Sequence, residues 1–284
     1  MSRTATEPPS SLQQLYEDPA TPVASGPERS RRQAAILALA LGETPSTIVD
    51  IGCGDGTAAA TASGALARHR LIGVDWSQDA LRRASAHLTA VRGELSPPGL
   101  PFATGSADAA LFSEVIEHLV DPDAALDELH RILRPGGHLL LSTPNLAAWY
   151  NRALLLFGTQ PVFSEVSLRG IHGRPGSQVV GHLRLFTARA LRSLLPAAGF
   201  RVLRITGAPY HDVPRPLRPL DRAACHVPSL ASILLVHAQA VHEPSRMGRE
   251  PQRTARGPSR APYEPPRTAR TPPRPARRPP EDGR

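Results

Sequence analysis

The chain has 284 residues, 40% of them hydrophobic, which permits one large domain or two small ones with a buried core. Its formal net charge is +8, and every basic residue is arginine because the sequence contains no lysine. The two cysteines, Cys53 and Cys225, exclude a disulfide framework and a cysteine-based zinc site. The sequence shows neither an apolar leader nor an apolar run of membrane-spanning length, so we expect a soluble, cytoplasmic protein with no membrane span.

The two ends of the chain differ in composition from the middle. Residues 1–27 are rich in proline, serine and threonine, whereas residues 243–284 contain 11 arginines, 11 prolines and only 5 acidic residues. Neither segment has the periodic hydrophobic pattern of a packed core, so we predict that both are disordered and that residues 28–242 form the folded domain. The arginine-rich tail suits weak, non-specific contact with nucleic acid or an anionic surface; a solvated tail without a partner is the alternative.

Between these ends, short hydrophobic strands alternate with helices. The expected strands are Thr47–Ile51, Leu71–Asp75, Ala109–Ser113, His138–Ser142, Phe200–Ile205 and Ser232–Ala238. The expected helices are Glu28–Leu41, an alanine-rich helix after residue 56, Gln78–Val91, a helix capped by Asp121, Leu146–Phe157 and Thr187–Ala198. This alternation predicts an α/β fold with a parallel sheet covered by helices on both faces. Residues from about 144 to 186 interrupt the pattern and are predicted to form a lid insertion.

A cluster of glycines follows the first expected strand, with Gly52, Gly54 and Gly56 at alternate positions. A glycine turn between a strand and a helix is a common nucleotide-binding arrangement. Asp75 ends the next strand 19 residues after Gly56, where a carboxylate can meet ribose hydroxyls. The G-x-G-x-G spacing differs from the G-x-G-x-x-G of dinucleotide-binding proteins, which disfavours a nicotinamide oxidoreductase; a tight turn without a ligand is the structural alternative.

Four ordered segments of the sequence resemble the class I S-adenosylmethionine-dependent methyltransferases. They are VDIGCGDG at 49–56, GVDWS at 73–77, LPFATGSADAALFSEVIEHL at 100–119 and LHRILRPGGHLLLSTPN at 129–145. The resemblance covers about residues 30–240 and is strongest to members of the methyltransferase type 11/12 kind. It implies a Rossmann-like, doubly wound, mostly parallel seven-stranded sheet, with S-adenosyl-L-methionine as the cofactor.

The same resemblance implies which residues hold the cofactor. The methionine part would lie against Asp50 and the glycine turn, the ribose hydroxyls would bind Asp75, and the adenine would lie beside Trp76. Glu94 and Leu95 fit, only approximately, the acidic and apolar pair that often follows the third strand of the family. The implied cofactor-binding residues are Asp50, Gly52, Cys53, Gly54, Gly56, Asp75, Trp76, Glu94, Leu95 and Ser113.

A second group of candidate residues follows Ser113, in the segment EVIEH. If this segment is helical, its i, i+3, i+4 spacing places Glu114, Glu117 and His118 on one side. Methyl transfer to a hydroxyl or a protonated amine requires removal of a proton, so these three residues are candidate catalytic residues. The structural alternative is an acidic helix start together with a histidine that bonds a neighbouring loop.

His182, in the segment VVGHLRLFT, extends this second group. The combination is similar to that of small-RNA ribose methyltransferases, in which such residues bind a divalent metal, and quinone-biosynthesis O-methyltransferases have a comparable E-x-x-E-H. The resemblance makes Glu114, Glu117, His118 and His182 candidate ligands of Mg²⁺ or Mn²⁺, cations that carboxylates and imidazoles suit. Many small-molecule methyltransferases carry the segment without a known metal, so a metal-free site is the alternative.

We therefore expect a methyltransferase that acts on a small-molecule acceptor, at oxygen. The alternatives are an RNA ribose methyltransferase with a divalent metal and a non-catalytic cofactor-binding protein. Residues 1–242 carry 22 arginines against 20 acidic residues and show no basic patch interleaved with aromatic residues, which disfavours RNA as the substrate.

Overall fold

The computed structural model describes residues 26–96, 99–176 and 180–242. The segments predicted to be disordered, 1–27 and 243–284, lie outside the described residues except for Gly26 and Pro27. All described residues belong to the unit that ends at His242. No helix in this described part is long and apolar enough to cross a membrane.

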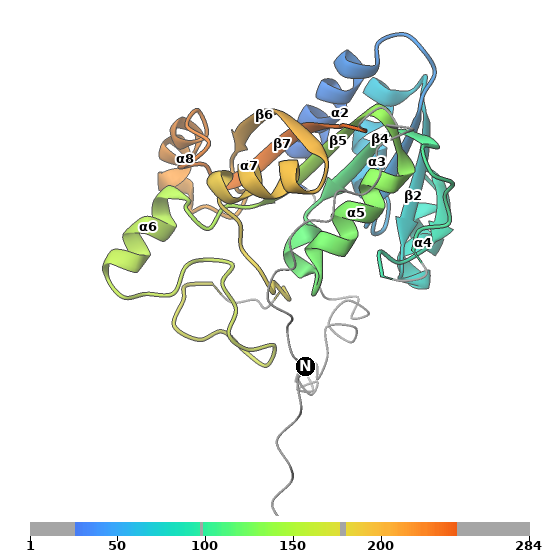
Figure 1. Cartoon of the computed structure of the whole chain (residues 1–284). Helices are drawn as coiled ribbons and strands as arrows, with labels where there is room; N and C mark the ends of the chain where they lie inside the picture. Colours follow the sequence, from blue (N-terminus) through green and yellow to red (C-terminus); the bar gives the residue numbers. More distant parts are fainter. Residues whose placement is uncertain (1–25, 97–98, 177–179, 243–284) are drawn as a thin grey trace, which may run out of the picture. The chain divides into compact units, whose positions relative to one another are not determined.

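A seven-stranded sheet forms the centre of the domain (Figure 1). Its order is β3-β2-β1-β4-β5-β7-β6; strands β1 to β5 run parallel, whereas β7 is antiparallel to both β5 and β6. The predicted mostly parallel, doubly wound sheet is therefore confirmed. The strands are β1 (Thr47–Ile51), β2 (Arg70–Asp75), β3 (Thr89–Arg92), β4 (Ala107–Ser113), β5 (Leu133–Pro144), β6 (Phe200–Ala208) and β7 (Ile233–Ala240).

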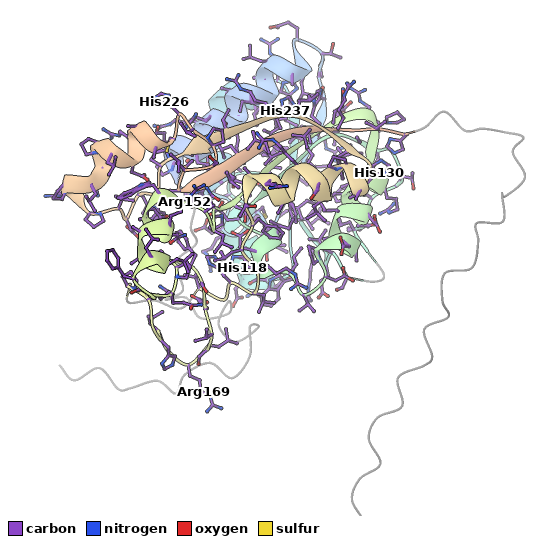
Figure 2. The ribbon with its side chains drawn as sticks, turned by 60° about the vertical axis from the view of Figure 1, so that its left-hand side comes forward. His118, His130, Arg152, Arg169, His226 and His237 are labelled. Carbon is purple, nitrogen blue, oxygen red and sulfur yellow. The ribbon has the colours of Figure 1, made fainter. Side chains whose placement is uncertain are left out.

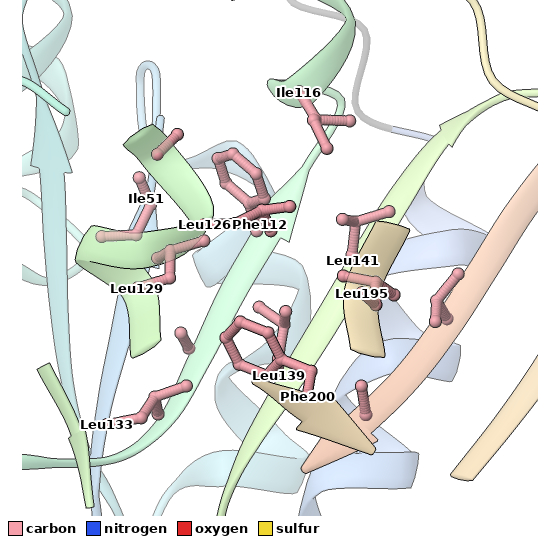
Figure 3. Close-up of a cluster of buried hydrophobic side chains, with 14 of the residues drawn as sticks. Ile51, Phe112, Ile116, Leu126, Leu129, Leu133, Leu139, Leu141, Leu195 and Phe200 are labelled. Carbon is pink, nitrogen blue, oxygen red and sulfur yellow. The ribbon is translucent and has the colours of Figure 1, made fainter. Parts of the chain in front are cut away.

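Helices cover both faces of this sheet (Figure 1). Side chains alternate between faces along β4. Phe112 lies beside Leu126 of α5, in a cluster that also contains Leu195 of α7 (Figure 3), whereas Leu111 belongs to the cluster with residues of α2 and α3. The helices are α2 (Pro27–Leu41), α3 (Thr57–Leu66), α4 (Gln78–Ala84), α5 (Pro122–Ile132), α6 (Trp149–Leu156), α7 (Ala188–Ala197) and α8 (Arg218–Ala224), with 3₁₀ turns at Ile116–His118 and Arg215–Leu217.

Several predicted boundaries differ from the structure, and the two largest errors concern the helix expected from Gln78 and the start of β5. The helix expected over Gln78–Val91 ends at Ala84, because Thr89 and Val91 pair with the neighbouring strand β2 as part of β3. Strand pairing is a tertiary contact, and it overrides a helical pattern that local sequence suggests. Strand β5 likewise begins at Leu133 rather than at the expected His138, because its first residue pairs with β4 ahead of an irregularity in the register.

The predicted insertion follows β5 and begins with α6. The described residues from 157 to 186 contain no helix or strand, apart from a bridge between Asn145 and Phe186. Regular structure resumes at α7, whose first turn is capped by the side chain of Thr187. We call residues 157–186 the lid. The order of the sheet reverses between β1 and β4, and ligands of such folds bind beyond the carboxyl ends of the strands at that point.

Candidate functional site

The glycine turn connects β1 to α3 at the sheet reversal. Gly52, Gly54 and Gly56 all have left-handed backbone, with φ of 72°, 55° and 80°. A Cβ atom at Gly52 would lie 2.5 Å from Cγ2 of Val115, and one at Gly56 would lie 3.0 Å from Cα of Ala84. Two of the three glycines are therefore required by close packing as well as by backbone conformation.

Asp75, at the end of β2, is bonded to this turn. Its Oδ2 accepts a hydrogen bond from the backbone N–H of Gly54 at 3.0 Å, and its Oδ1 accepts one from Ser77 at 2.9 Å. A carboxylate has about four acceptor positions. Asp75 can therefore still accept two hydroxyl hydrogens, as its predicted ribose-binding role requires. The bond to the glycine turn is a second role that the sequence did not indicate.

Asp50 and Cys53 lie buried under the turn. Burial, with a smaller contribution from nearby Asp75, raises the pKa of the Asp50 carboxyl to about 7. Burial also raises the pKa of the Cys53 thiol far above its usual range, so this cysteine is not a thiolate nucleophile.

The remaining predicted cofactor residues follow the same edge of the sheet. Trp76 is half-buried directly after β2, while Glu94 is exposed and Leu95 half-buried just after β3. The hydroxyl of Ser113 exchanges hydrogen bonds with the buried side chain of Gln33 in α2, at 2.9 and 3.1 Å. Gln33 contacts this predicted site residue, and no motif in the sequence indicated it. The roles of these residues toward a cofactor remain predictions.

Glu114 does not share a helical face with Glu117 and His118, so this expectation is wrong. The backbone N–H of Glu114 still bonds strand β5, at the carbonyl of Ser142, and its φ is 56°. Only residues 116–118 form a 3₁₀ turn. The Glu114 carboxylate accepts a hydrogen bond from Ser142 Oγ at 2.8 Å and lies 3.7 Å from a guanidinium nitrogen of buried Arg29.

Three of the four candidate metal ligands do come together. One potential ligand atom from each of Glu117, His118 and His182 lies within 4.8 Å of the other two. Figure 2 shows His118 between the body of the domain and the lid, whose outer end carries Arg169. The lid backbone reaches this position because the N–H groups of Leu183 and Arg184 both donate to the carbonyl of Glu117, at 2.9 and 3.0 Å. We call Glu117, His118 and His182 the ligand cluster.

Glu117 has a fully buried side chain in this cluster. Its Oε2 accepts a hydrogen bond from Thr143 Oγ1 at 2.9 Å, whereas Oε1 has no hydrogen-bond partner among the described residues and lies 4.0 Å from His118 Nε2. Burial, and secondly the charge of Glu114, raise the pKa of this carboxyl well above its usual range. The charge of Arg29 offsets only part of this rise, and a cation bound beside the carboxylate would stabilise its charged form further.

The two histidines of the cluster have the same tautomer. Nδ1 of His118 donates to the carbonyl of Gly181, and Nδ1 of His182 donates to the carbonyl of Phe163, both at 3.2 Å. Each neutral ring therefore carries its lone pair on Nε2. Burial lowers the pKa of His118 to about 3, with a further contribution from His182, and burial lowers the pKa of His182 to about 4. Neutral imidazoles and a buried carboxylate are a donor set that fits a divalent cation.

Comparison with known proteins identifies the family. Residues 27–205 match the family model described as a methyltransferase domain. The chain belongs to the methyltransferase domain family. It is a member of the class I S-adenosylmethionine-dependent methyltransferase family, as the four sequence segments predicted. A solved S-adenosylmethionine-dependent methyltransferase of Methanosarcina mazei has the same fold, with a TM-score of 0.52 and 19% identity over 73% of this chain and 98% of that one.

Curated relatives of this methyltransferase act on different atoms. The chain is 32% identical over 55% of its length to a probable S-adenosylmethionine-dependent methyltransferase of Mycolicibacterium smegmatis and covers 52% of that protein. It is 34% identical over 44% of its length to the ubiquinone/menaquinone biosynthesis C-methyltransferase of Syntrophotalea carbinolica, covering 57%. It is 40% identical over 39% of its length to a malonyl-[acyl-carrier protein] O-methyltransferase of Herminiimonas arsenicoxydans, covering 42%. The chain thus spans about half the length of these relatives.

Proposed function

We propose that this methyltransferase transfers the methyl group of S-adenosyl-L-methionine to an oxygen atom of a small-molecule acceptor. We further propose that Glu117, His118 and His182 hold a divalent cation, Mg²⁺ or Mn²⁺, beside the acceptor. The observation that supports the proposal best is the ligand cluster itself, in which an unpartnered buried carboxylate oxygen lies next to two histidines that the lid backbone orients.

The cofactor side of the proposal follows from the glycine turn and Asp75. The turn would receive the methionine part next to Asp50, and the two remaining acceptor positions of Asp75 would bind the ribose hydroxyls. Trp76 would lie beside the adenine. When bound, the cofactor supplies an electrophilic methyl group, so the protein has only to align the acceptor and to remove its proton.

On the acceptor side, the three residues of the ligand cluster have distinct roles in the proposal. Glu117 Oε1 and the Nε2 atoms of both histidines would be the ligand atoms. Thr143 orients the carboxylate through its hydrogen bond to Oε2. A bound divalent cation acts as a Lewis acid, which makes an acceptor hydroxyl easier to deprotonate.

This arrangement favours a cation over histidine acting alone as the base. With a pKa of about 3, His118 binds a proton weakly, and a general base works best with a pKa near the working pH. Glu114 is not part of the proposed ligand set, because Ser142 and Arg29 already bind its carboxylate. Glu117 as a metal-free base remains the competing assignment, and an excess of chelator distinguishes the two.

Manganese binding tests the cation directly. Isothermal titration of the full-length protein with Mn²⁺, in the presence of S-adenosylhomocysteine, should give one site. Replacement of His182 by alanine removes a ligand and should weaken binding by on the order of 100-fold, because even partners that only orient a ligand contribute 10- to 100-fold. His172→Ala is the matched control, because His172 is an exposed histidine of the same lid and lies outside the cluster. Equal Mn²⁺ affinity in the two variants contradicts the proposed site.

Methyl transfer is tested with a panel of acceptors and radiolabelled cofactor. Small hydroxyl and carboxyl compounds should be labelled, and labelling should stop in excess chelator and return with Mn²⁺. The same cluster would serve an RNA ribose methyltransferase, so a short RNA belongs in the panel; label on RNA alone would replace the small-molecule assignment. Cofactor binding without labelling of any acceptor, and without Mn²⁺ binding, would favour a non-catalytic cofactor-binding protein.

A further inference from the structure

We infer that Glu165, a lid residue outside every motif of the sequence, is the positioning residue that holds the two histidines of the ligand cluster in place. This inference rests on the proposed cation site. Glu165 lies 17 residues before His182, and its carboxylate is 3% exposed.

Among the described residues, four donors converge on the Glu165 carboxylate. Its Oε1 accepts from the backbone N–H of Val180 at 2.8 Å and from the guanidinium of buried Arg174 at 3.0 Å. Its Oε2 accepts from the backbone N–H groups of Gly181 and His182, at 2.7 and 3.1 Å. One side chain therefore holds three successive peptide units, and the arginine balances its charge.

Two of the three residues held in this way, Gly181 and His182, orient the cluster. The carbonyl of Gly181 accepts the Nδ1 hydrogen of His118, which fixes that ring and its tautomer. The peptide unit of His182 carries the second ring, whose centroid lies 4.7 Å from that of His118. Groups that hydrogen-bond a metal-binding histidine through its other nitrogen set its orientation and tautomer. Glu165 does not contact the His118 ring through a hydrogen bond of its own; it binds the backbone N–H groups of Gly181 and His182, next to the Gly181 carbonyl that accepts from the ring.

A residue that only attached the lid to the domain would make hydrogen bonds between the two. The bonds from Leu183 and Arg184 to the carbonyl of Glu117 already attach the lid to the domain, one residue beyond the cluster. The hydrogen-bond donors to Glu165 among the described residues all belong to the lid itself, so these bonds do not contribute to that attachment. They act on the conformation of residues 180–182, and therefore on Gly181 and His182.

The substitution Glu165→Gln tests the positioning role by removing a single acceptor oxygen. A glutamine keeps one acceptor oxygen and replaces the other with an NH₂ group, which can only donate. The NH₂ group must then face either the donors of Val180 and Arg174 or those of Gly181 and His182. Two donors cannot bond each other, so one pair loses its acceptor and the 180–182 backbone must shift.

The closing experiment measures two properties of the full-length protein, neither of which is turnover. Mn²⁺ affinity is measured by titration calorimetry, and the protonated nitrogen of each histidine is read from ¹⁵N resonances of the metal-free protein. Asp221→Asn is the matched control: Asp221 is a buried carboxylate that accepts from Trp149 Nε1, the Tyr210 N–H and Ser232 Oγ, three donors that lie outside the lid. Both variants should lower the melting temperature, so stability alone does not distinguish them.

We expect Glu165→Gln to weaken Mn²⁺ binding 10- to 100-fold and to abolish the Nδ1-protonated form of His118 or His182. Asp221→Asn should leave both properties unchanged. Wild-type Mn²⁺ affinity and wild-type imidazole resonances in folded Glu165→Gln overturn the inference; if that variant does not fold, the same result in Glu165→Asp, whose oxygens lie one carbon further back, overturns it. If the wild type binds no Mn²⁺ but Glu165→Gln still changes the histidine tautomers, the positioning role stands and the cation proposal fails.

Discussion

Replacement of Gly52 by alanine tests the close packing of the glycine turn. The new methyl group would lie 2.5 Å from Val115 Cγ2, and the backbone there has φ of 72°. The left-handed conformation costs about 1–2 kcal/mol for a residue with a Cβ atom. Displacing Val115, which packs against the main core, costs about 1–3 kcal/mol as overpacking. We therefore expect Gly52→Ala to lower the free energy of unfolding by about 2–5 kcal/mol.

Gly158 provides a control that separates the two contributions. Its φ is 67°, and a Cβ atom there would meet nothing within 4 Å, so Gly158→Ala should lose only the conformational contribution of about 1–2 kcal/mol. Urea denaturation followed by circular dichroism measures both variants, and Val115→Ala in combination with Gly52→Ala should recover the packing contribution. Equal losses in Gly52→Ala and Gly158→Ala would refute the argument from packing, because both positions have a positive φ and only Gly52 has a close neighbour at the Cβ position.

Three further predictions concern other parts of the domain. Asp75→Asn should weaken S-adenosylhomocysteine binding by about 1.5–3 kcal/mol in calorimetry, because charge-assisted hydrogen bonds are lost; unchanged affinity would exclude Asp75 from the cofactor site. Burial lowers the pKa of His237 to about 4, so the unfolded chain binds more protons below pH 6.5, and acidification from pH 6.5 to 4 should destabilise the wild type more than His237→Gln; parallel pH profiles in urea denaturation would be the contrary result. Cutting the chain after His242, which stacks on His130 at 4.2 Å, should leave the melting temperature unchanged in scanning calorimetry, whereas a large drop would move the domain boundary.

The effect of His237 on the pH dependence of stability is the difference between the profiles of the wild type and His237→Gln. Asp50 and Glu117 have raised carboxyl pKa values, so the native state binds more protons than the unfolded state between pH 4 and 7. Their contribution to stability therefore falls as the pH rises, which is opposite in sign to that of His237. The wild type and His237→Gln both contain Asp50 and Glu117, so the difference between their pH profiles isolates the contribution of the histidine.

The sequence predicted most of the fold because its strands are short hydrophobic runs between clear helix signals. Asp121 does cap α5, with its carboxylate accepting from the Ala124 N–H at 2.9 Å, and Pro122 is in the first turn. Strand β3 was missed because Thr89–Arg92 is stabilised by pairing with β2, a long-range contact without a local signal.

The site was only partly predictable for a similar reason. Glu117, His118 and His182 were candidate ligands from the family resemblance, and the structure brings them together, but the i, i+3, i+4 argument wrongly placed Glu114 on the same helical face. The bond from its N–H to Ser142 continues the strand pairing, and no helix forms. Gln33 and Glu165 belong to no sequence motif. Gln33 bonds Ser113, 80 residues away in the chain, and Glu165 bonds residues up to 17 positions away.

The most direct test of the account is a crystal structure with S-adenosylhomocysteine and Mn²⁺, with anomalous data collected at the manganese edge. The account predicts the cofactor beyond the carboxyl ends of β1 and β2, with its ribose on Asp75, and one strong anomalous peak within coordination distance of Glu117, His118 and His182. A bound cofactor without a manganese peak at these residues would contradict the cation site. Absence of the cofactor from the glycine turn would contradict the assignment of the cofactor site.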